Sequence, residues 1–418
     1  MQLPKMTRIR QCFEKMVVND IAGEIRSQMN ALDLKDKIAL GGSVAVACSS
    51  RGIANYAEIV AAVVANVKKL GLTPFLIPAM GSHGAATGPG QKQVLENYGL
   101  TVEKVGAQIR SDLDVDYIAE TREGIPVCID RHANQADHIV LINRIKQHTE
   151  FDHEIESGLM KMMAIGLGKE KGARLYHQGI MVYGYPRVIV SVARQVLQTG
   201  KILLAIGVVE NGYAQTAHIT VTDATRLEER EKAALKIAKH LAPRLPFEDV
   251  DVLIIDEMGK DISGTGFDTK IVGRILMPLV AKEPASPHVK RIVVCDLTAM
   301  TAGNADGIGL ADFTTRQLVD KIDLAALYVN ALAGAEPEHA KIPLTLPSAR
   351  EAIQAAIDSV ELIPKEKLRV MRIKNTMELE YVDISPAYLE SLQENANIEV
   401  VSKKKAMTFD GNGNLEMF

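Results

Sequence analysis

The sequence predicts an α/β fold made of two α/β domains with largely parallel sheets. Segments rich in Val, Ile and Leu alternate with segments of helical periodicity along most of the chain, which is the pattern of βαβ units. The length of 418 residues exceeds the usual size of one domain, and two prolines in the run 242–248 mark a linker. We therefore expect an N-terminal cofactor-binding and catalytic domain over residues 1–245 and a C-terminal domain over residues 246–418 that closes over the substrate. The active site is expected in the cleft between them.

The individual elements follow from hydrophobic period and turn residues, taken in order along the chain. A β-rich run, a segment with helical spacing and a second short apolar run predict one βαβ unit over residues 38–48, 55–70 and 74–78. The same signals predict strands at 124–129, 138–142, 201–209 and 217–221, and helices at 91–98, 186–198 and 224–241. In the C-terminal domain they predict strands at 250–255 and 291–295, and helices at 323–332 and 348–360.

Composition and charge exclude several classes of function. Apolar residues make up 47% of the chain, and the formal net charge of −4 provides neither a basic stripe for nucleic acid nor a polybasic tract for a membrane surface. No apolar run approaches the roughly 18–20 residues that a bilayer span needs. The four cysteines are isolated and the N-terminus lacks a charged-then-apolar signal region, so we expect a reduced, cytoplasmic protein. The oligomeric state, including a homo-oligomer, stays open.

Polar residues stand at loop positions directly after predicted strands, where α/β sheets bind their ligands. Arg51 follows the first strand and could hold a carboxylate with two hydrogen bonds, although a surface salt bridge is the simpler reading. His83 lies between glycines in Gly81-Ser-His-Gly84, and His148 follows the strand at 138–142. A lone loop histidine is often structural, but three such groups at one sheet edge indicate a site.

A lysine and further histidines complete the candidate set. Lys161 stands among Leu and Met residues, where burial would lower its pKa and expose a neutral amine; a lysine with only its stem buried is the alternative. His177, taken alone, reads as a helix-end histidine. His153 competes with His148 as the histidine that follows the third strand, and we prefer His148 because it is nearer the strand end.

The order Ser50-Arg51, glycine-flanked His83, His148, Lys161, His177 resembles the lactate racemase-like family of nickel-pincer racemases and epimerases. The spacings from Arg51 to His83, from His83 to His148 and from Lys161 to His177 match that pattern. The resemblance covers residues from about 38 to 250 well and the remainder loosely. The motifs are short, but they occur in one register.

The resemblance implies a role for each of these residues. Lys161 would be tethered to a nickel-pincer nucleotide, a pyridinium-derived mononucleotide that chelates nickel, and His177 would be the protein ligand of the metal. Ser50 would contact the cofactor and Arg51 the carboxylate of a small-molecule 2-hydroxy acid. His83 and His148 would act as the acid and base on either side of C2, through a 2-keto acid intermediate.

The chain also departs from the family's pattern. The aspartate and threonine expected before the arginine are replaced by Cys48, Ser49 and Ser50, and the gap from His148 to Lys161 is longer, which keeps His153 as an alternative. In the C-terminal domain a glycine-rich loop follows a strand and offers polar groups for a substrate larger than lactate. These groups are Lys260, Asp268 and Lys270.

Two other classes of function stay open at this point. The histidines could form an ordinary zinc or iron site of a hydrolase or dehydratase, with Lys161 as a plain base. The chain could also be a non-enzymatic ligand-binding protein, because a fold does not dictate a function.

Overall fold

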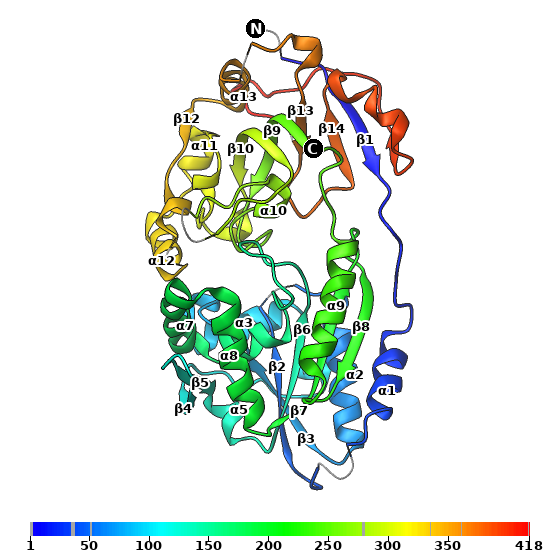
Figure 1. Ribbon diagram of the computed structural model, residues 1–418, viewed down its shortest axis with the longest axis vertical. Helices are drawn as coiled ribbons and strands as arrows, with labels where there is room; N and C mark the ends of the chain where they lie inside the picture. The colour runs from blue at the N-terminus through cyan, green and yellow to red at the C-terminus, as the bar shows by residue number, and fades with distance from the viewer. Residues whose placement is uncertain are drawn as a thin grey trace. The chain divides into compact units, whose positions relative to one another are not determined.

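The computed structural model describes residues 3–34, 38–50, 52–277, 281–334, 336–360, 362–416 and 418. The chain divides into two compact units, which are described one at a time (Figure 1). The N-terminal unit consists of Glu14–His148 and Asp152–Ala242, and the C-terminal unit consists of Met1–Phe13, Thr149–Phe151 and Pro243–Phe418.

A five-stranded sheet forms the centre of the N-terminal unit in the described part of the chain, with strand order β3-β2-β6-β7-β8. Neighbouring strands from β3 to β7 are parallel, and β8 pairs antiparallel with β7. The prediction of a largely parallel sheet is confirmed. The strands are β2 (Ser43–Cys48), β3 (Thr73–Pro78), β6 (His138–Arg144), β7 (Ile202–Glu210) and β8 (Thr216–Thr222).

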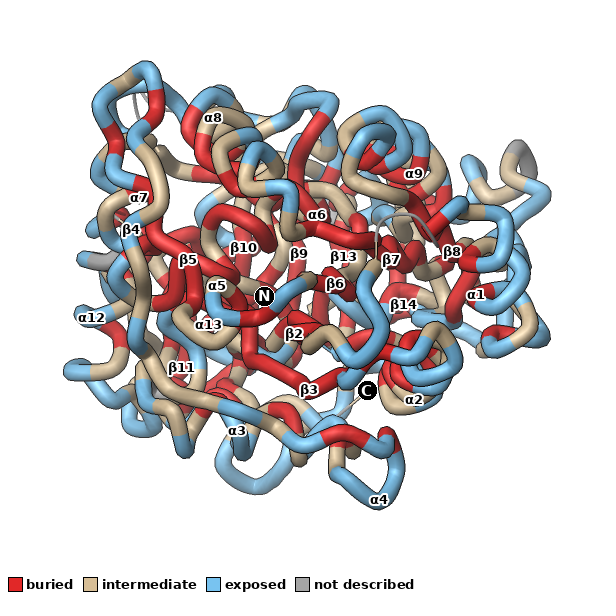
Figure 2. Tube along the Cα trace, turned by 90° about the horizontal axis from the view of Figure 1, so that it is seen from below, coloured by how far each residue is buried: buried red, intermediate tan, exposed pale blue. Residues whose placement is uncertain are grey.

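Alternate side chains of these strands enter two different cores, so the sheet is covered on both faces. Val44 and Val46 pack with the apolar faces of α1, α2 and α3, whereas Ala45 and Ala47 pack with α7, α8 and α9. The buried strands stand out in Figure 2 as red segments between partly exposed helices. The helices are α1 (Ile21–Asn30), α2 (Tyr56–Lys69), α3 (Gly88–Asn97), α7 (Lys169–Tyr183), α8 (Tyr185–Gln198) and α9 (Leu227–Leu241).

One local feature of this unit differs from the sequence expectation. The predicted strand at 124–129 is β5 (Pro126–Asp130), which pairs with β4 (Val115–Glu120) as a separate antiparallel ribbon and does not join the main sheet. The segment around Lys161 is a short helix, α6 (Leu159–Lys161), that continues as a π-helix over Met162–Gly166. Short helices α4 (Val102–Val105) and α5 (Arg131–Gln135) complete the unit.

The C-terminal unit contains a mixed sheet, eight-stranded within the described residues, with order β12-β11-β10-β9-β13-β14-β1-β15. Strands from β12 to β13 are parallel, and the remaining pairings are antiparallel. The strands are β1 (Thr7–Gln11), β9 (Asp249–Met258), β10 (His288–Leu297), β11 (Phe313–Thr315), β12 (Leu344–Leu346), β13 (Val370–Ile373), β14 (Tyr381–Ile384) and β15 (Ile398–Val400). The helices are α10 (Thr269–Val272), α11 (Arg316–Val319), α12 (Leu324–Gly334) and α13 (Ala349–Asp358).

The N-terminal strand β1 belongs to the sheet of the C-terminal unit, whereas the sequence analysis expects all of residues 1–245 in the N-terminal domain. Ile9 pairs with Val382 of β14 and Val400 of β15, and it is fully buried. This pairing joins residues that are far apart in the sequence, so local sequence patterns do not predict it.

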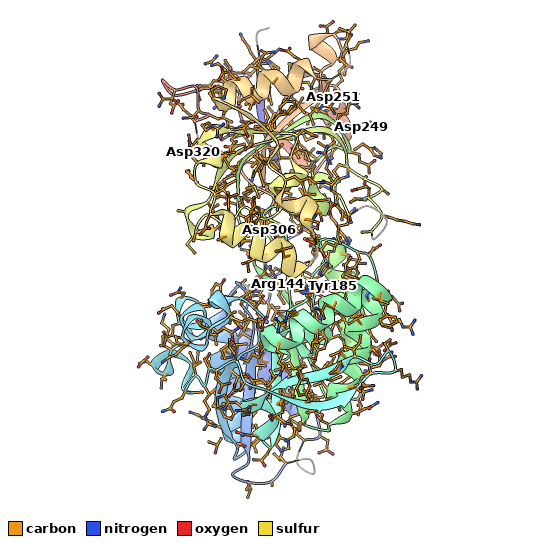
Figure 3. The ribbon with its side chains drawn as sticks, turned by 90° about the vertical axis from the view of Figure 1, so that its left-hand side faces the viewer. Arg144, Tyr185, Asp249, Asp251, Asp306 and Asp320 are labelled. Atoms are coloured by element: carbon orange, nitrogen blue, oxygen red, sulfur yellow. The ribbon has the colours of Figure 1, made fainter. Side chains whose placement is uncertain are left out.

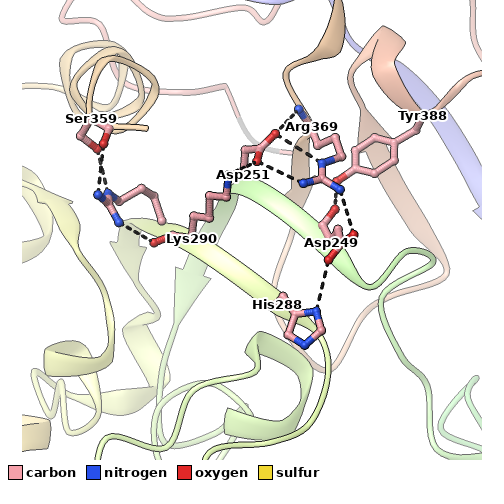
Figure 4. Close-up of polar contacts among 8 residues, drawn as sticks. Asp249, Asp251, His288, Lys290, Ser359, Arg369 and Tyr388 are labelled. Atoms are coloured by element: carbon pink, nitrogen blue, oxygen red, sulfur yellow. Dashed lines mark hydrogen bonds and ion pairs between the residues drawn. The ribbon is translucent and has the colours of Figure 1, made fainter. Parts of the chain in front are cut away.

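An ion-pair network ties together the starts of β9, β10 and β13 (Figure 4). Arg369 pairs with Asp249 and with the buried Asp251, which also lies 3.2 Å from Lys290 Nζ. The Tyr388 hydroxyl donates to the carbonyl of Asp249 at 2.8 Å. Because the network lies at the amino ends of parallel strands, it reads as a stabilising feature rather than as part of a site.

Within the described residues, no helix is both long and apolar enough to cross a membrane.

Candidate functional site

The carboxyl ends of β2, β3 and β6 lie next to one another, since these strands are parallel neighbours in the sheet. Ser50 follows β2, His83 follows β3 and His148 follows β6. The Ser50 hydroxyl and Nδ1 of His83 form a hydrogen bond, so the structure brings two of the predicted residues into contact. Arg51 lies outside the described residues.

Cys48, Ser49 and Ser50, which precede position 51, differ from one another in burial. Cys48 is fully buried, and burial raises the pKa of its thiol to about 12, so the thiolate is not available at neutral pH. Ser49 is also buried, and its carbonyl accepts a hydrogen bond from the Tyr56 hydroxyl at 3.2 Å. Of these three residues, Ser50 is the one that reaches the sheet edge.

A buried polar network beneath His83 holds its loop in place. The wholly buried Gln91 donates through Nε2 to the carbonyl oxygens of Gly81 at 2.8 Å and of His83 at 3.2 Å. Lys169, also wholly buried, places Nζ 2.7 Å from the carbonyl oxygen of Pro78, 3.3 Å from Gln91 Oε1 and 2.8 Å from Asp130 Oδ2. The loop that carries His83 is therefore anchored to the start of α7.

Gly84, next to His83, allows the His83 loop to pack closely against the backbone of α3. Gly84 has φ of +67°, and a Cβ there would lie 2.7 Å from the backbone nitrogen of Gln91. A side chain at this position would meet both backbone strain and backbone atoms that cannot move aside.

Lys161 and His148 form the second contact within the candidate site. Lys161 Nζ lies 2.8 Å from Nε2 of His148 and 5.3 Å from the ring centroid of Tyr185. The rings of His148 and Tyr185 are 4.5 Å apart between centroids. The lysine is half-buried and the histidine is buried, so the amine, the imidazole and the aromatic ring share one partly desolvated place.

The loop after β6 places the rings of His148 and His153 in different surroundings. Glu156, wholly buried, accepts hydrogen bonds from the backbone nitrogens of His148 at 2.6 Å and of His153 at 3.1 Å, and pairs with Lys239 at 2.5 Å. The Nδ1 atom of His153 accepts from the backbone nitrogen of Ile155 at 3.1 Å, so this ring is bonded within its own loop. His148 is the histidine that reaches Lys161.

Arg144 is a residue at the same sheet edge that the sequence analysis did not single out. It ends β6, and its Nη1 lies 2.6 Å from Glu210 Oε2 at the end of β7. Glu210 Oε1 also accepts from the backbone nitrogen of Ala54 at 2.7 Å, which ties the loop after β2 to both strands. Figure 3 shows Arg144 and Tyr185 at the same end of the N-terminal unit. The sequence signal that could have identified Arg144 is its position just after a predicted strand, which is also the signal that pointed to Arg51.

The remaining predicted residues lie on α7 and in the C-terminal unit. His177 is half-buried on α7 of the N-terminal unit. In the C-terminal unit, Lys260 Nζ pairs with Asp306 at 2.6 Å and donates to the carbonyl oxygen of Gly264 at 2.5 Å, while Asp268 accepts from the backbone nitrogen of Lys270 at the start of α10. Lys260 and Asp268 thus stabilise the glycine-rich loop itself. Among the described residues, no group of three or more His, Cys, Asp and Glu side chains could hold a metal ion.

One family profile matches part of the chain. The sequence profile of the lactate racemase N-terminal domain matches residues 12–185. Among solved structures, the chain resembles the lactate racemase apoprotein from Thermoanaerobacterium thermosaccharolyticum, with 13% identity and a TM-score of 0.44 over 69% of this chain and 68% of that one. No curated protein sequence matches the chain.

We expect Lys169→Met to lower the free energy of unfolding by about 3–5 kcal/mol, because it leaves Asp130 as an uncompensated buried charge. The measurement is urea-induced unfolding followed by circular dichroism. The exposed Lys171, two residues away on α7, is the matched control, and Lys171→Met should change stability by no more than about 0.5 kcal/mol. Equal effects of the two substitutions would contradict the anchoring role of Lys169.

Proposed function

We propose that this chain, whose residues 12–185 match the profile of the lactate racemase N-terminal domain, is an isomerase that inverts the C2 centre of a 2-hydroxy acid. The contact between Lys161 Nζ and His148 Nε2 carries this proposal. An amine beside an imidazole at the carboxyl edge of a parallel sheet supplies an attachment point and a proton carrier in one place.

Three residues of the N-terminal unit are the groups that we assign to a nickel-pincer nucleotide. Lys161 offers a half-buried amine for covalent attachment, His177 offers a half-buried imidazole as the protein's ligand to nickel, and Ser50 offers a hydroxyl at the sheet edge. Nitrogen and sulfur donors in a tetragonal arrangement suit Ni(II). When bound, this group supplies a reversible hydride acceptor for the C2 hydrogen.

The chain's own residues bind the acid and move the hydroxyl proton. We assign Arg51 to the substrate carboxylate, because a guanidinium can hold a carboxylate with two parallel hydrogen bonds. His83 and His148 are the acid and base, one on each side of C2. One takes the proton of the hydroxyl group as the 2-keto acid forms. The other returns a proton to the same oxygen when the hydrogen comes back to the opposite face of C2. Since Ser50 engages Nδ1 of His83, proton transfer at this ring takes place at Nε2.

Attachment of Lys161 changes the charge beside His148. In the structure the amine lies at hydrogen-bond distance from the imidazole, and an ammonium there disfavours a second positive charge on the ring. A neutral linkage at Lys161 would remove that repulsion.

The substrate is proposed to be larger than lactate, such as a sugar acid or a hydroxy diacid. The change at Ser50, which contacts His83 at the sheet edge, supports this proposal.

Isotope retention tests the proposed reaction. Protein co-produced with the enzymes that build the cofactor is incubated with single enantiomers of 2-hydroxy acids carrying deuterium at C2, and the products are analysed by chiral chromatography with mass spectrometry. We expect inversion with deuterium retained at C2, and faster inversion of a larger acid than of lactate. Loss of deuterium to water would contradict hydride transfer. Failure to invert any acid, in protein shown to carry the cofactor, would contradict the isomerase assignment.

We expect His148→Gln to lower kcat for inversion by about 10²–10⁴, the usual contribution of a general acid or base. His153→Gln is the matched control, because its ring is bonded within the same loop, and it should leave kcat close to that of the parent protein. Steady-state inversion rates with both variants check this ranking, and the reverse order would reassign the base to His153.

A further inference from the structure

The turn that leads into Lys161 is held from two sides by side chains of other elements. Asn143, near the end of β6, donates through Nδ2 to the carbonyl oxygen of Gly158 at 2.7 Å. On the other side, the backbone nitrogen of Met160 donates to Oε2 of Glu231 at 2.8 Å. Lys161 is the next residue along the chain, so its backbone position depends on these two bonds.

Glu231 is an unusual residue for this place. It lies on α9 and its side chain is wholly buried, although a carboxyl group is costly to bury unless it forms hydrogen bonds. Its Oε1 has no hydrogen-bond partner among the described residues. The carboxyl group therefore serves the backbone of the turn, through Met160.

Gly158 makes room for this carboxyl group. A Cβ at Gly158 would lie 2.2 Å from Glu231 Oε1 and 2.7 Å from its Cδ. The backbone of Gly158 is extended, with φ of −176°, so any residue could adopt it, and the requirement is one of space. Glycine at 158 and glutamate at 231 are therefore complementary.

The helix that carries Lys161 needs such an anchor. Glycine at its N-terminal boundary has no side chain to bond the first free backbone N–H groups. The helix continues as a π-helix over Met162–Gly166, a conformation that is rarely stable without tertiary support. Glu231 caps the first turn from a helix distant in sequence.

We infer that Glu231 is a positioning residue for Lys161, which sets the place of the lysine amine relative to His148 by bonding the backbone N–H of Met160. The catalytic importance of this position rests on the proposed function, in which Lys161 carries the cofactor. The position itself can be measured on the cofactor-free protein.

The charge state of Glu231 determines which substitution is the conservative one. Its pKa is raised to about 8, because burial, with a smaller contribution from the nearby Glu228, outweighs the opposing effect of the backbone N–H groups of Met160 and Leu159. A carboxyl whose pKa is higher in the folded than in the unfolded chain stabilises the fold most below about pH 4.5, and this contribution is lost as pH rises towards 8. Glu231→Gln keeps an acceptor and cannot ionise, so it should gain stability relative to the parent over that range.

The test compares Glu231→Leu, Glu231→Gln and the matched control Glu228→Gln in the full chain without cofactor. Labelled acetic anhydride modifies lysines, and peptide mass spectrometry gives the rate for Lys161 as a function of pH, while hydrogen exchange reports on the Met160 amide. We expect Glu231→Leu to change the Lys161 rate about fivefold or more, the size expected from one lost hydrogen bond, and to accelerate exchange at Met160. Glu231→Gln and Glu228→Gln should match the parent in both measurements.

An unchanged Lys161 pH profile in folded Glu231→Leu would overturn the inference and leave Glu231 with a purely structural role. If that variant does not fold, Gly158→Ala replaces it, because the added methyl group displaces the carboxyl; the same shift is expected, and an unchanged profile again overturns the inference. A shifted profile in protein that never inverts a hydroxy acid would reject the proposed function but keep the positioning role.

Discussion

The hydrogen bond between Lys161 and His148 is the interaction on which the site depends. At 2.8 Å it joins a primary amine to an imidazole, and the ring of Tyr185 lies against both groups. An amine and an imidazole this close, in half-buried surroundings, influence each other's protonation. The remainder of the N-terminal unit keeps the two groups in this arrangement.

Buried polar side chains of distant segments hold the site, each by bonding the backbone of a loop or turn. Gln91 and Lys169 bond the backbone of the His83 loop and its strand, Glu156 bonds that of the His148 loop, and Glu231 bonds that of the turn before Lys161. Because a buried polar group is costly when its bonds are broken, each of these contacts resists displacement of the segment it holds. The candidate site residues stand on irregular segments whose backbone is held by these hydrogen bonds.

The sheet of the N-terminal unit and the placement of its edge residues could be predicted from the sequence, because β2, β3 and β6 have strong apolar runs and their loops carry Ser50, His83 and His148. The supporting residues could not be predicted. A buried Glu231 or Lys169 looks like any helix-surface charge in a sequence, and the contact of His148 with Lys161 depends on the path of a loop that the buried Glu156 holds. The pairing of β1 with β14 joins opposite ends of the chain, and periodicity contains no information on it.

The most direct test of the account is peptide mass spectrometry with nickel analysis on protein co-produced with the cofactor-building enzymes. We expect an added mass on the peptide containing Lys161, with nickel bound, and loss of the added mass in Lys161→Arg. An unmodified Lys161 in protein from a host shown to supply the cofactor to a known racemase would contradict it.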